Sequence, residues 1–362
     1  MAKQVRLSTL IMLIAILLVG GGVIYWSTQR QHQHSRMSDP HFGIADPDLL
    51  GDTVPMLVSQ LAAMKAIGIT SVRVDADWAM VQPAGPLTFS WTRLDRVVSA
   101  ARAAGMSVDL IVDGCPRWAA LANTSGDSSP QPASSAQYAS WAADVAKRYA
   151  PQGVNTFEIW NEPNIALFWQ PKPDPSAYTA DLVAAYSAIK AVDPSAFVIS
   201  GGLAPTVTKN HNISAIDFLK AMYADGAKGS FDAFGYHPYS FPELPDSNKS
   251  GWSQMARTSP SLRSVMIRNG DGNKPIWVTE FGAPSGGPGG VGESAQATAL
   301  TQAVADVKAT PWIGALYVYT WQDNGFDPHN AQDWFGLLTA RGSTKPAFRA
   351  LAAAIDSSSA SP

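Results

Sequence analysis

The segment VNTFEIWNEPN at residues 154–164 is followed, after a short loop, by AYTADLVAAYSAIKAV at residues 177–192. The first segment opens with a run of β-branched and aromatic residues, which is typical of a buried strand. The second is rich in alanine and carries apolar residues at helical spacing, which predicts an amphipathic helix. Together the two segments form a strand-then-helix unit, and the fold class depends on whether this unit recurs.

The same unit recurs along the chain from residue 42 onwards. We expect eight strands, at residues 42–46, 71–78, 107–114, 154–164, 197–202, 231–240, 274–282 and 314–323. Strands that are apolar on both faces and alternate with helices indicate a parallel sheet covered by helices. Eight such units within roughly 300 residues predict an α/β fold with a single domain, the (β/α)8 TIM barrel.

An open, doubly wound sheet is the alternative architecture. Its dinucleotide-binding form carries a G-x-G-x-x-G loop after the first strand. Residues 46–53 read DPDLLGDT and lack this pattern, which favours the closed barrel. Helical patterns follow all eight predicted strands, and the pattern at residues 251–268, after the sixth, is a weak one.

An apolar segment precedes the predicted barrel. Residues 9–26 read TLIMLIAILLVGGGVIYW, eighteen residues without a charge, and no A-x-A-type cleavage site follows them. We therefore expect a transmembrane signal anchor, with residues 1–8 in the cytoplasm and residues 27–40 as a polar tether. The barrel at residues 41–356 would then lie outside the cytoplasm, ending in a disordered tail at residues 357–362. A cleaved signal peptide, which would secrete the same barrel, is the alternative.

The composition narrows the class of protein. Hydrophobic residues make up 46% of the chain and charged residues 15%, which argues against a disordered or coiled-coil protein. Lysine plus arginine number 26 and aspartate plus glutamate 29, a near-neutral balance that does not suit a nucleic-acid binder. The single cysteine, Cys115, cannot form an internal disulfide and argues against a cysteine-based metal site.

Two of the predicted strands run into a glutamate. The fourth ends in Trp160-Asn161-Glu162-Pro163 and the seventh contains Thr279-Glu280. Because the carboxyl ends of barrel strands meet at one mouth, we expect Glu162 and Glu280 to face each other there. Two facing carboxyl groups are what glycoside hydrolysis requires: one protonates the leaving oxygen, and the other attacks the sugar or activates water.

FEIWNEPN and WVTEFG resemble the two catalytic signatures of glycoside hydrolase clan A, the retaining (β/α)8 glycosidases. The layout is most similar to family 39 and to family 5, the cellulase-like group, and the resemblance extends from about residue 41 to the last helix. It implies that Glu162 is the acid/base and Glu280 the nucleophile. It also implies that Asn161 binds the 2-hydroxyl of the sugar in the −1 subsite.

Other segments resemble further elements of the clan. GYHPY at residues 235–239 resembles its His-x-Tyr element, which implies that His237 and Tyr239 flank the nucleophile and bind substrate. Trp321, in YTWQDNG, resembles its sugar platform, and an indole ring has the flat apolar face that stacks on a sugar. Three further tryptophans near strand ends are weaker candidates for outer sugar subsites: Trp78, Trp118 and Trp169.

Arg73, in SVRVDAD, resembles the arginine that keeps the nucleophile of the clan ionised. It lies inside an apolar strand, where an unpaired charge is costly, so it needs a carboxylate partner. The sequence favours Glu280 as that partner and leaves Asp75 and Asp113 open.

These residues predict a retaining glycoside hydrolase. We expect it to cleave O-glycosidic bonds of an extracellular or cell-envelope polysaccharide or oligosaccharide by double displacement, through a covalent glycosyl-enzyme. Its two catalytic carboxyl groups should lie about 5–5.5 Å apart, the separation found in retaining enzymes. No metal or organic cofactor is expected, because two carboxyl groups carry this chemistry unaided.

The expected partners are a carbohydrate substrate and, through the N-terminal helix, a membrane. Two other functions fit the same residues. A transglycosylase would pass the same intermediate to a sugar hydroxyl, and a catalytically silent barrel would only bind glycans. The sugar, the linkage and the choice between exo and endo action are left open by the sequence.

Overall fold

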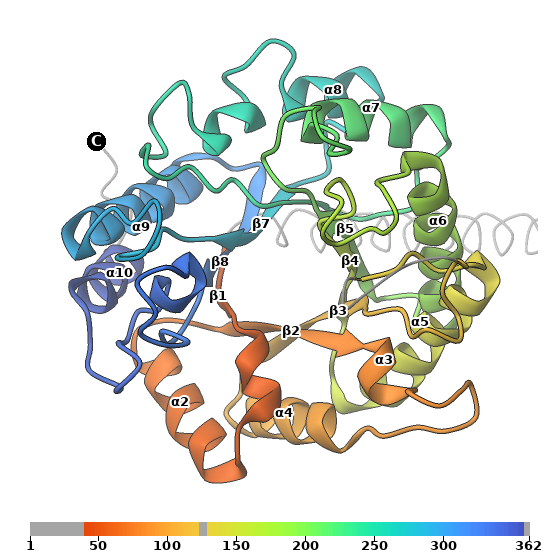
Figure 1. Cartoon of the computed structure of the whole chain (residues 1–362), viewed down its shortest axis with the longest axis horizontal. Coiled ribbons are helices and arrows are strands. Elements are labelled where there is room, and N and C mark those ends of the chain that lie inside the picture. Colours follow the sequence, from red (N-terminus) through yellow and green to blue (C-terminus); the bar gives the residue numbers. More distant parts are fainter. Residues whose placement is uncertain (1–39, 123–128, 358–362) are drawn as a thin grey trace, which may run out of the picture. The chain divides into compact units, whose positions relative to one another are not determined.

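The structure, a computed structural model, describes residues 40–122 and 129–357 and consists of parallel strands enclosed by helices (Figure 1). In these residues the strands are β1 (His41–Ala45), β2 (Ser71–Asp77), β3 (Ser107–Asp113), β4 (Thr156–Asn161), β5 (Phe197–Gly202), β6 (Phe234–Tyr236), β7 (Ile276–Phe281) and β8 (Ile313–Tyr319). The helices are α2 (Val54–Ala66), α3 (Trp78–Val81), α4 (Thr92–Ala103), α5 (Ser135–Tyr149), α6 (Pro175–Val192), α7 (Ala215–Ala224), α8 (Leu262–Arg268), α9 (Glu293–Ala309) and α10 (Pro346–Asp356). Short 3₁₀ helices are η1 (Pro47–Gly51), η2 (Ala150–Gln152), η3 (Gly251–Met255) and η4 (Ala331–Trp334).

The strands pair in parallel in the order β5-β4-β3-β2-β1-β8-β7-β6. The two ends of this order, β5 and β6, meet through the isolated parallel bridges Ile199–Ala233 and Leu203–Tyr236. The sheet therefore closes on itself almost completely. This confirms the predicted (β/α)8 barrel.

Some of the helices begin at a side-chain cap, as α6 does, and the helices bury an apolar stripe against the sheet. The Asp174 side chain accepts hydrogen bonds from the backbone N–H groups of Ser176 and Ala177, and Pro175 occupies the first turn of α6. Helix α4 shows the stripe, since its buried residues recur every three or four positions: Leu94, Val97, Val98 and Ala101.

The segments around β6 differ from expectation. β6 spans three residues rather than the ten of the predicted strand, and Pro238, which follows it closely, lacks the N–H that a continued strand would need. The weak helical pattern after it forms η3 and the short helix α8 instead of one helix. Pro260 stands between the two, and a capping box of Ser261 and Ser264 begins α8.

The barrel interior combines a small apolar cluster with buried charged side chains at neighbouring register positions. A small apolar cluster fills the inside of the sheet: Ala45, Ile199, Ala233, Trp277, Ala315 and Tyr317. The strand register aligns Arg73 on β2 with Asp109 on β3, and Asp109 with Thr156 at the start of β4. Charged side chains are therefore buried inside the barrel, and Arg73 reaches Glu280 at the mouth.

The predicted membrane anchor, residues 9–26, lies outside the described residues. Within residues 40–122 and 129–357, no helix has both the length and the apolar character needed to cross a bilayer.

Candidate active site

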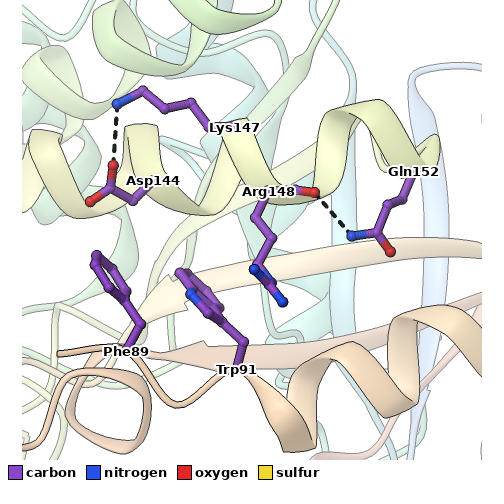
Figure 2. Close-up of a pocket in the computed structure, with 6 residues that line it drawn as sticks. All are labelled: Phe89, Trp91, Asp144, Lys147, Arg148 and Gln152. Carbon is purple, nitrogen blue, oxygen red and sulfur yellow. Dashed lines mark hydrogen bonds and ion pairs between the residues drawn. The ribbon is translucent and has the colours of Figure 1, made fainter.

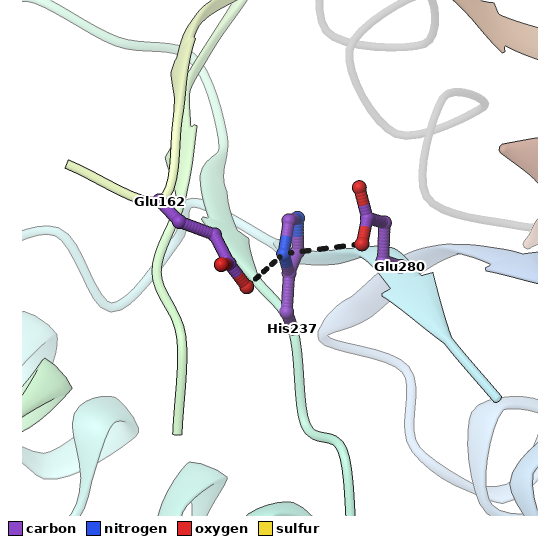
Figure 3. A group of neighbouring side chains, drawn as sticks. All are labelled: Glu162, His237 and Glu280. Carbon is purple, nitrogen blue, oxygen red and sulfur yellow. Dashed lines mark hydrogen bonds and ion pairs between the residues drawn. The ribbon is translucent and has the colours of Figure 1, made fainter. Parts of the chain in front are cut away.

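Glu162 and Glu280 meet at the carboxyl ends of β4 and β7 (Figure 3). One carboxylate oxygen of each, together with a ring nitrogen of His237, lie within 4.8 Å of one another. The Glu162 side chain is 11% exposed and that of Glu280 is 15% exposed, so both can be reached from the mouth. The expectation that these two residues face each other is therefore met in the structure.

The backbone at the end of β4 is unusual. Trp160 has a φ of 71° and Glu162 a φ of 45°, values that residues other than glycine rarely adopt. The N–H of Glu162 donates to the carbonyl of Gly202 on β5, at 3.0 Å. Such conformations persist where surrounding contacts enforce them, and they cluster at functional sites.

Glu280 is held by two strong donors. Arg73 Nη1 lies 2.6 Å from its Oε1, and the Tyr239 hydroxyl donates to its Oε2 at 2.8 Å. Burial alone would raise the pKa of Glu280, but the His237 ring in its charged form, the Arg73 guanidinium and the Tyr239 hydroxyl outweigh it and lower that pKa below its ordinary value. Glu280 is therefore ionised at neutral pH.

Arg73 has a second carboxylate partner, Glu158, that the sequence analysis missed. Its Nε lies 2.6 Å from Glu158 Oε2, and its Nη2 lies 3.1 Å from Glu158 Oε1. In the described part of the chain, neither Asp75 nor Asp113 forms an ion pair with Arg73. The sequence does contain a sign of this pairing. Glu158 lies inside the apolar strand FEIWN, and a buried carboxylate, like a buried arginine, needs a partner of opposite charge.

His237 lies between the two carboxylates, as Figure 3 shows. Its Nδ1 is 3.0 Å from Glu162 Oε1 and 3.6 Å from Glu280 Oε2. Its Nε2 is 3.1 Å from the hydroxyl of Thr279, and the whole side chain is buried. His237 and Tyr239 thus flank Glu280, as the His-x-Tyr resemblance implies.

Asn161 also belongs to the cluster. Its Oδ1 accepts a hydrogen bond from Arg73 Nη2 at 3.0 Å. Its amide nitrogen makes no hydrogen bond to any residue the structure describes, so it is available to a sugar hydroxyl.

The prediction for Trp321 as sugar platform is wrong. The Trp321 side chain is 1% exposed and packs against Phe348 with ring centroids 5.8 Å apart, so a sugar has no access to either face. β8 ends two residues earlier, at Tyr319, which remains partly exposed. Tyr319 packs edge-on against Tyr239 at 6.4 Å and lies close enough to Glu280 for that charge to raise its pKa, an effect second to burial. Tyr319 is the aromatic residue of β8 at the mouth.

The other candidate tryptophans differ in their exposure to solvent. Trp78 and Trp169 are fully buried, which excludes them as sugar platforms in this structure. Trp118 remains partly exposed; its indole N–H donates to the carbonyl of Gln82 at 2.7 Å, and its ring packs edge-on against Trp78.

Acidic side chains end the neighbouring strands. Burial raises the pKa of Asp46, after β1, to about 7 and that of Asp75, on β2, to about 6. Burial, reinforced by Asp75 and Asp77, also raises the pKa of Asp113 on β3. Near neutral pH this side of the mouth therefore carries less negative charge than its composition implies.

The cluster of Glu162, His237 and Glu280 is also compact enough for a metal ion. The Arg73 guanidinium already balances the charge of Glu280, and a second cation beside it would be repelled. This arrangement suits acid–base chemistry better than metal coordination.

A surface cavity of about 430 Å³ lies away from these residues, between the loop before α4 and the outer helix α5 (Figure 2). The rings of Phe89 and Trp91 stack there with centroids 5.4 Å apart, and the Arg148 guanidinium lies 5.1 Å from the Trp91 ring centre. It is lined by Phe89, Trp91, Asp144, Lys147, Arg148 and Gln152, so it contains neither glutamate of the mouth.

Comparisons with known proteins bear on the family and the fold of the chain. Residues 56–320 match the family model described as cellulase, glycosyl hydrolase family 5. A search of curated proteins gives no significant match. Among solved structures, a family 39 glycoside hydrolase from Bacteroides cellulosilyticus WH2 has a TM-score of 0.68 and 22% identity, covering 89% of this chain and 64% of its own. This chain therefore spans less than two thirds of that enzyme.

Two further structures are similar. A monomeric β-xylosidase from Caulobacter crescentus CB15 has a TM-score of 0.63 and 20% identity, with 88% of this chain and 67% of that chain covered. A GH5_18 enzyme from Streptomyces cattleya, solved with GlcNAc, has a TM-score of 0.64 and 18% identity, with 90% and 82% covered. At these identities the likeness establishes the fold alone. Because the family model matches most of its length, the chain belongs to glycosyl hydrolase family 5.

Proposed function

We propose that the chain is a retaining glycosidase in which Glu280 is the nucleophile and Glu162 the acid/base. The observation that carries the proposal is the approach of a Glu162 oxygen and a Glu280 oxygen to within 4.8 Å at the barrel mouth. Retaining enzymes hold these groups about 5–5.5 Å apart, whereas inverting enzymes leave about 6.5–9.5 Å for a water molecule.

In the first step a Glu280 oxygen attacks the anomeric carbon while Glu162 gives its proton to the glycosidic oxygen. The bond to the leaving sugar breaks, and an ester joins the substrate to Glu280. Arg73 and Tyr239 orient the carboxylate for this attack, since each binds one of its oxygens. Neither donor covers both oxygens, so one lone pair can still point to the sugar.

In the second step water gives a proton to the Glu162 carboxylate and attacks the same carbon. The ester bond breaks, Glu280 becomes a carboxylate again, and two inversions give overall retention. The Asn161 amide nitrogen would bind the 2-hydroxyl, and Tyr319 offers an aromatic face to the ring. No cofactor enters either step.

The proposed substrate is a polysaccharide or oligosaccharide outside the cell or in its envelope. The apolar segment at residues 9–26 supports this location, because it would hold the barrel on the outer side of a membrane as a signal anchor. Mass spectrometry of the mature N-terminus tests it. A soluble protein that starts near residues 27–40 would replace the anchor with a cleaved signal peptide and leave export intact.

The activity is tested with the full chain, on a panel of aryl glycosides and envelope polysaccharides. For the substrate that is cleaved, proton NMR of the first-formed product should give the anomeric configuration of the substrate. A 2-deoxy-2-fluoro glycosyl fluoride of the same sugar should label Glu280, detectable by peptide mass spectrometry. An inverted product would rule out the retaining mechanism. Product analysis with and without an acceptor sugar separates hydrolysis from transglycosylation.

A further inference from the structure

A chain of hydrogen bonds leads from Glu162 into the barrel. Glu162 Oε1 is 3.0 Å from His237 Nδ1, and His237 Nε2 is 3.1 Å from the Thr279 hydroxyl. That hydroxyl is in turn 3.1 Å from Glu158 Oε1. His237, Thr279 and Glu158 are fully buried, so water does not compete for these bonds. The direction of each bond can therefore be assigned from the inner end.

Glu158 accepts at every contact. Both of its oxygens bind the Arg73 guanidinium, which cannot lose its proton. Its Oε1 also accepts from the backbone N–H of Gly202, at 2.8 Å. Glu158 is thus a carboxylate without a proton, and the single hydroxyl proton of Thr279 must point to it.

The Thr279 oxygen is then left as an acceptor for His237. Since Nε2 of His237 faces that oxygen, Nε2 carries the ring proton. A neutral imidazole has only one N–H, so in the neutral ring Nδ1 has none and must accept, whereas a doubly protonated ring would donate from Nδ1 as well. The partner of Nδ1 at hydrogen-bond distance is Glu162, and with a neutral ring the only proton available for that bond is the carboxylic acid proton of Glu162.

Other charged groups around His237 do not change this assignment. Glu280 is 3.6 Å from Nδ1, beyond a good hydrogen bond, and its Oε2 already accepts from the Tyr239 hydroxyl. Gly202 makes the close contact possible, because a Cβ there would lie 2.1 Å from His237 Nε2 and 2.6 Å from the Thr279 hydroxyl.

We propose that Thr279, anchored by Glu158, is a positioning residue that fixes His237 as the Nε2–H tautomer and thereby holds the proton of Glu162 in place for catalysis. The inference rests on the proposed function for the role of Glu162, but the tautomer itself does not. Without the threonine hydroxyl, Nε2–H would lose its acceptor. Nε2 would then release its proton to solvent and the Glu162 proton would move to Nδ1, which leaves a neutral Nδ1–H ring that donates to a Glu162 carboxylate, the wrong form for a general acid.

The direct test is the histidine side-chain ¹⁵N NMR spectrum of the full-length protein. The chain has six histidines, and the signal missing from the His237→Asn variant identifies His237. We expect the wild type to give the Nε2–H pattern and Thr279→Val to lose it, while Thr279→Ser restores it. An Nδ1–H pattern or a doubly protonated ring in the wild type, or an unchanged spectrum in Thr279→Val, would overturn the proposal.

Thr179→Val is the matched control. Thr179 on α6 is equally buried, and its hydroxyl has no hydrogen-bond partner in the described residues. This variant should leave the His237 signal and the activity unchanged. A change in the His237 signal here as large as in Thr279→Val would mean that the effect comes from packing and would also overturn the proposal.

Kinetics test the consequence for Glu162. In Thr279→Val, kcat/KM should fall about tenfold on a substrate with a poor leaving group, the size of one lost hydrogen bond of about 1.4 kcal/mol. On a dinitrophenyl glycoside, which needs little protonation, it should change less than about twofold. Equal losses on both substrates would contradict the role assigned to Thr279. A protein with the expected tautomer but no glycosidase activity would refute the proposed function and leave the tautomer assignment standing.

Discussion

The two glutamates at the mouth lie in different surroundings although they are chemically identical. Glu280 receives an arginine at 2.6 Å and a tyrosine hydroxyl at 2.8 Å, whereas Glu162 meets one imidazole nitrogen at 3.0 Å. The Arg73 guanidinium keeps its positive charge, and this charge holds Glu280 in its ionised form. An imidazole can donate or accept, so Glu162 can change its protonation state during a reaction. The proposed difference in role therefore rests on the neighbouring side chains, since the two carboxyl groups themselves are alike.

The substitution Glu280→Gln should have the largest effect on activity. An amide cannot form the ester intermediate, so turnover should fall by about 10⁴-fold or more on good and poor leaving groups alike. Initial rates on an aryl glycoside and on the natural glycan measure this. Glu243→Gln, an exposed glutamate in the loop after β6, serves as the control and should keep full activity. Substantial turnover by Glu280→Gln would remove it from the nucleophile's role.

Glu162→Ala should have a smaller and more selective effect. We expect a loss of about 10²–10⁴-fold on poor leaving groups, the usual contribution of a general acid. With a dinitrophenyl glycoside the first step should survive, so that the glycosyl-enzyme accumulates and is seen by mass spectrometry. Azide should restore turnover and give a glycosyl azide of the substrate's own configuration. Rescue of the Glu280 variant with that product, and not of the Glu162 variant, would reverse the two roles.

Glu158→Gln tests whether the ion pair with Arg73, which also binds Glu280, contributes to the stability of the folded protein. The substitution leaves the Arg73 charge buried with one anion fewer, which should lower the free energy of unfolding by about 3 kcal/mol. Urea unfolding followed by circular dichroism measures the change. Asp217→Asn breaks an exposed pair with Lys220 and should cost less than about 1 kcal/mol. Similar losses for the two variants would mean that Glu158 does not balance Arg73.

Tyr239→Phe tests the pKa of Glu280. The nucleophile must be ionised, and removing a donor to its charged form raises its pKa, so activity should be lost at higher pH on the acid side. We expect the acidic limb of kcat/KM to move up by about one pH unit, the equivalent of one hydrogen bond to a charged group. Tyr236→Phe, whose hydroxyl donates to the Gly251 carbonyl, should leave the limb in place. An unshifted limb in Tyr239→Phe would show that the phenol does not tune Glu280.

The fold and the centre of the site could be predicted because their signals are local. Eight strand-then-helix units are visible as changes of hydrophobic period, and Glu162 and Glu280 follow directly from their place at strand ends. Arg73 could be matched to Glu280 because a buried cation must have an anion.

The rest depends on where side chains point, which spacing alone does not give. Trp321 looks equivalent to Tyr319 in an alternating pattern, but the strand ends between them and the chain carries Trp321 into the core. Glu158 and Thr279 sit inside apolar strands, and only the closed barrel brings them to Arg73 and His237. The short β6 was overestimated because Pro238 interrupts a segment of otherwise strand-like composition.

The closure of the barrel between β5 and β6 has a consequence for local stability. These strands meet through isolated bridges, whereas their other neighbours pair along continuous ladders. The backbone N–H of His237 donates across this seam to Leu203, and the Glu162–His237 bond connects the β4 side to the β6 side. Native-state fluctuations that separate β5 from β6 must therefore also break the hydrogen bond between Glu162 and His237. A sugar bound at the mouth would therefore stabilise the pairing of β5 with β6. Amide hydrogen exchange near Leu203 and His237 would slow when the site is filled.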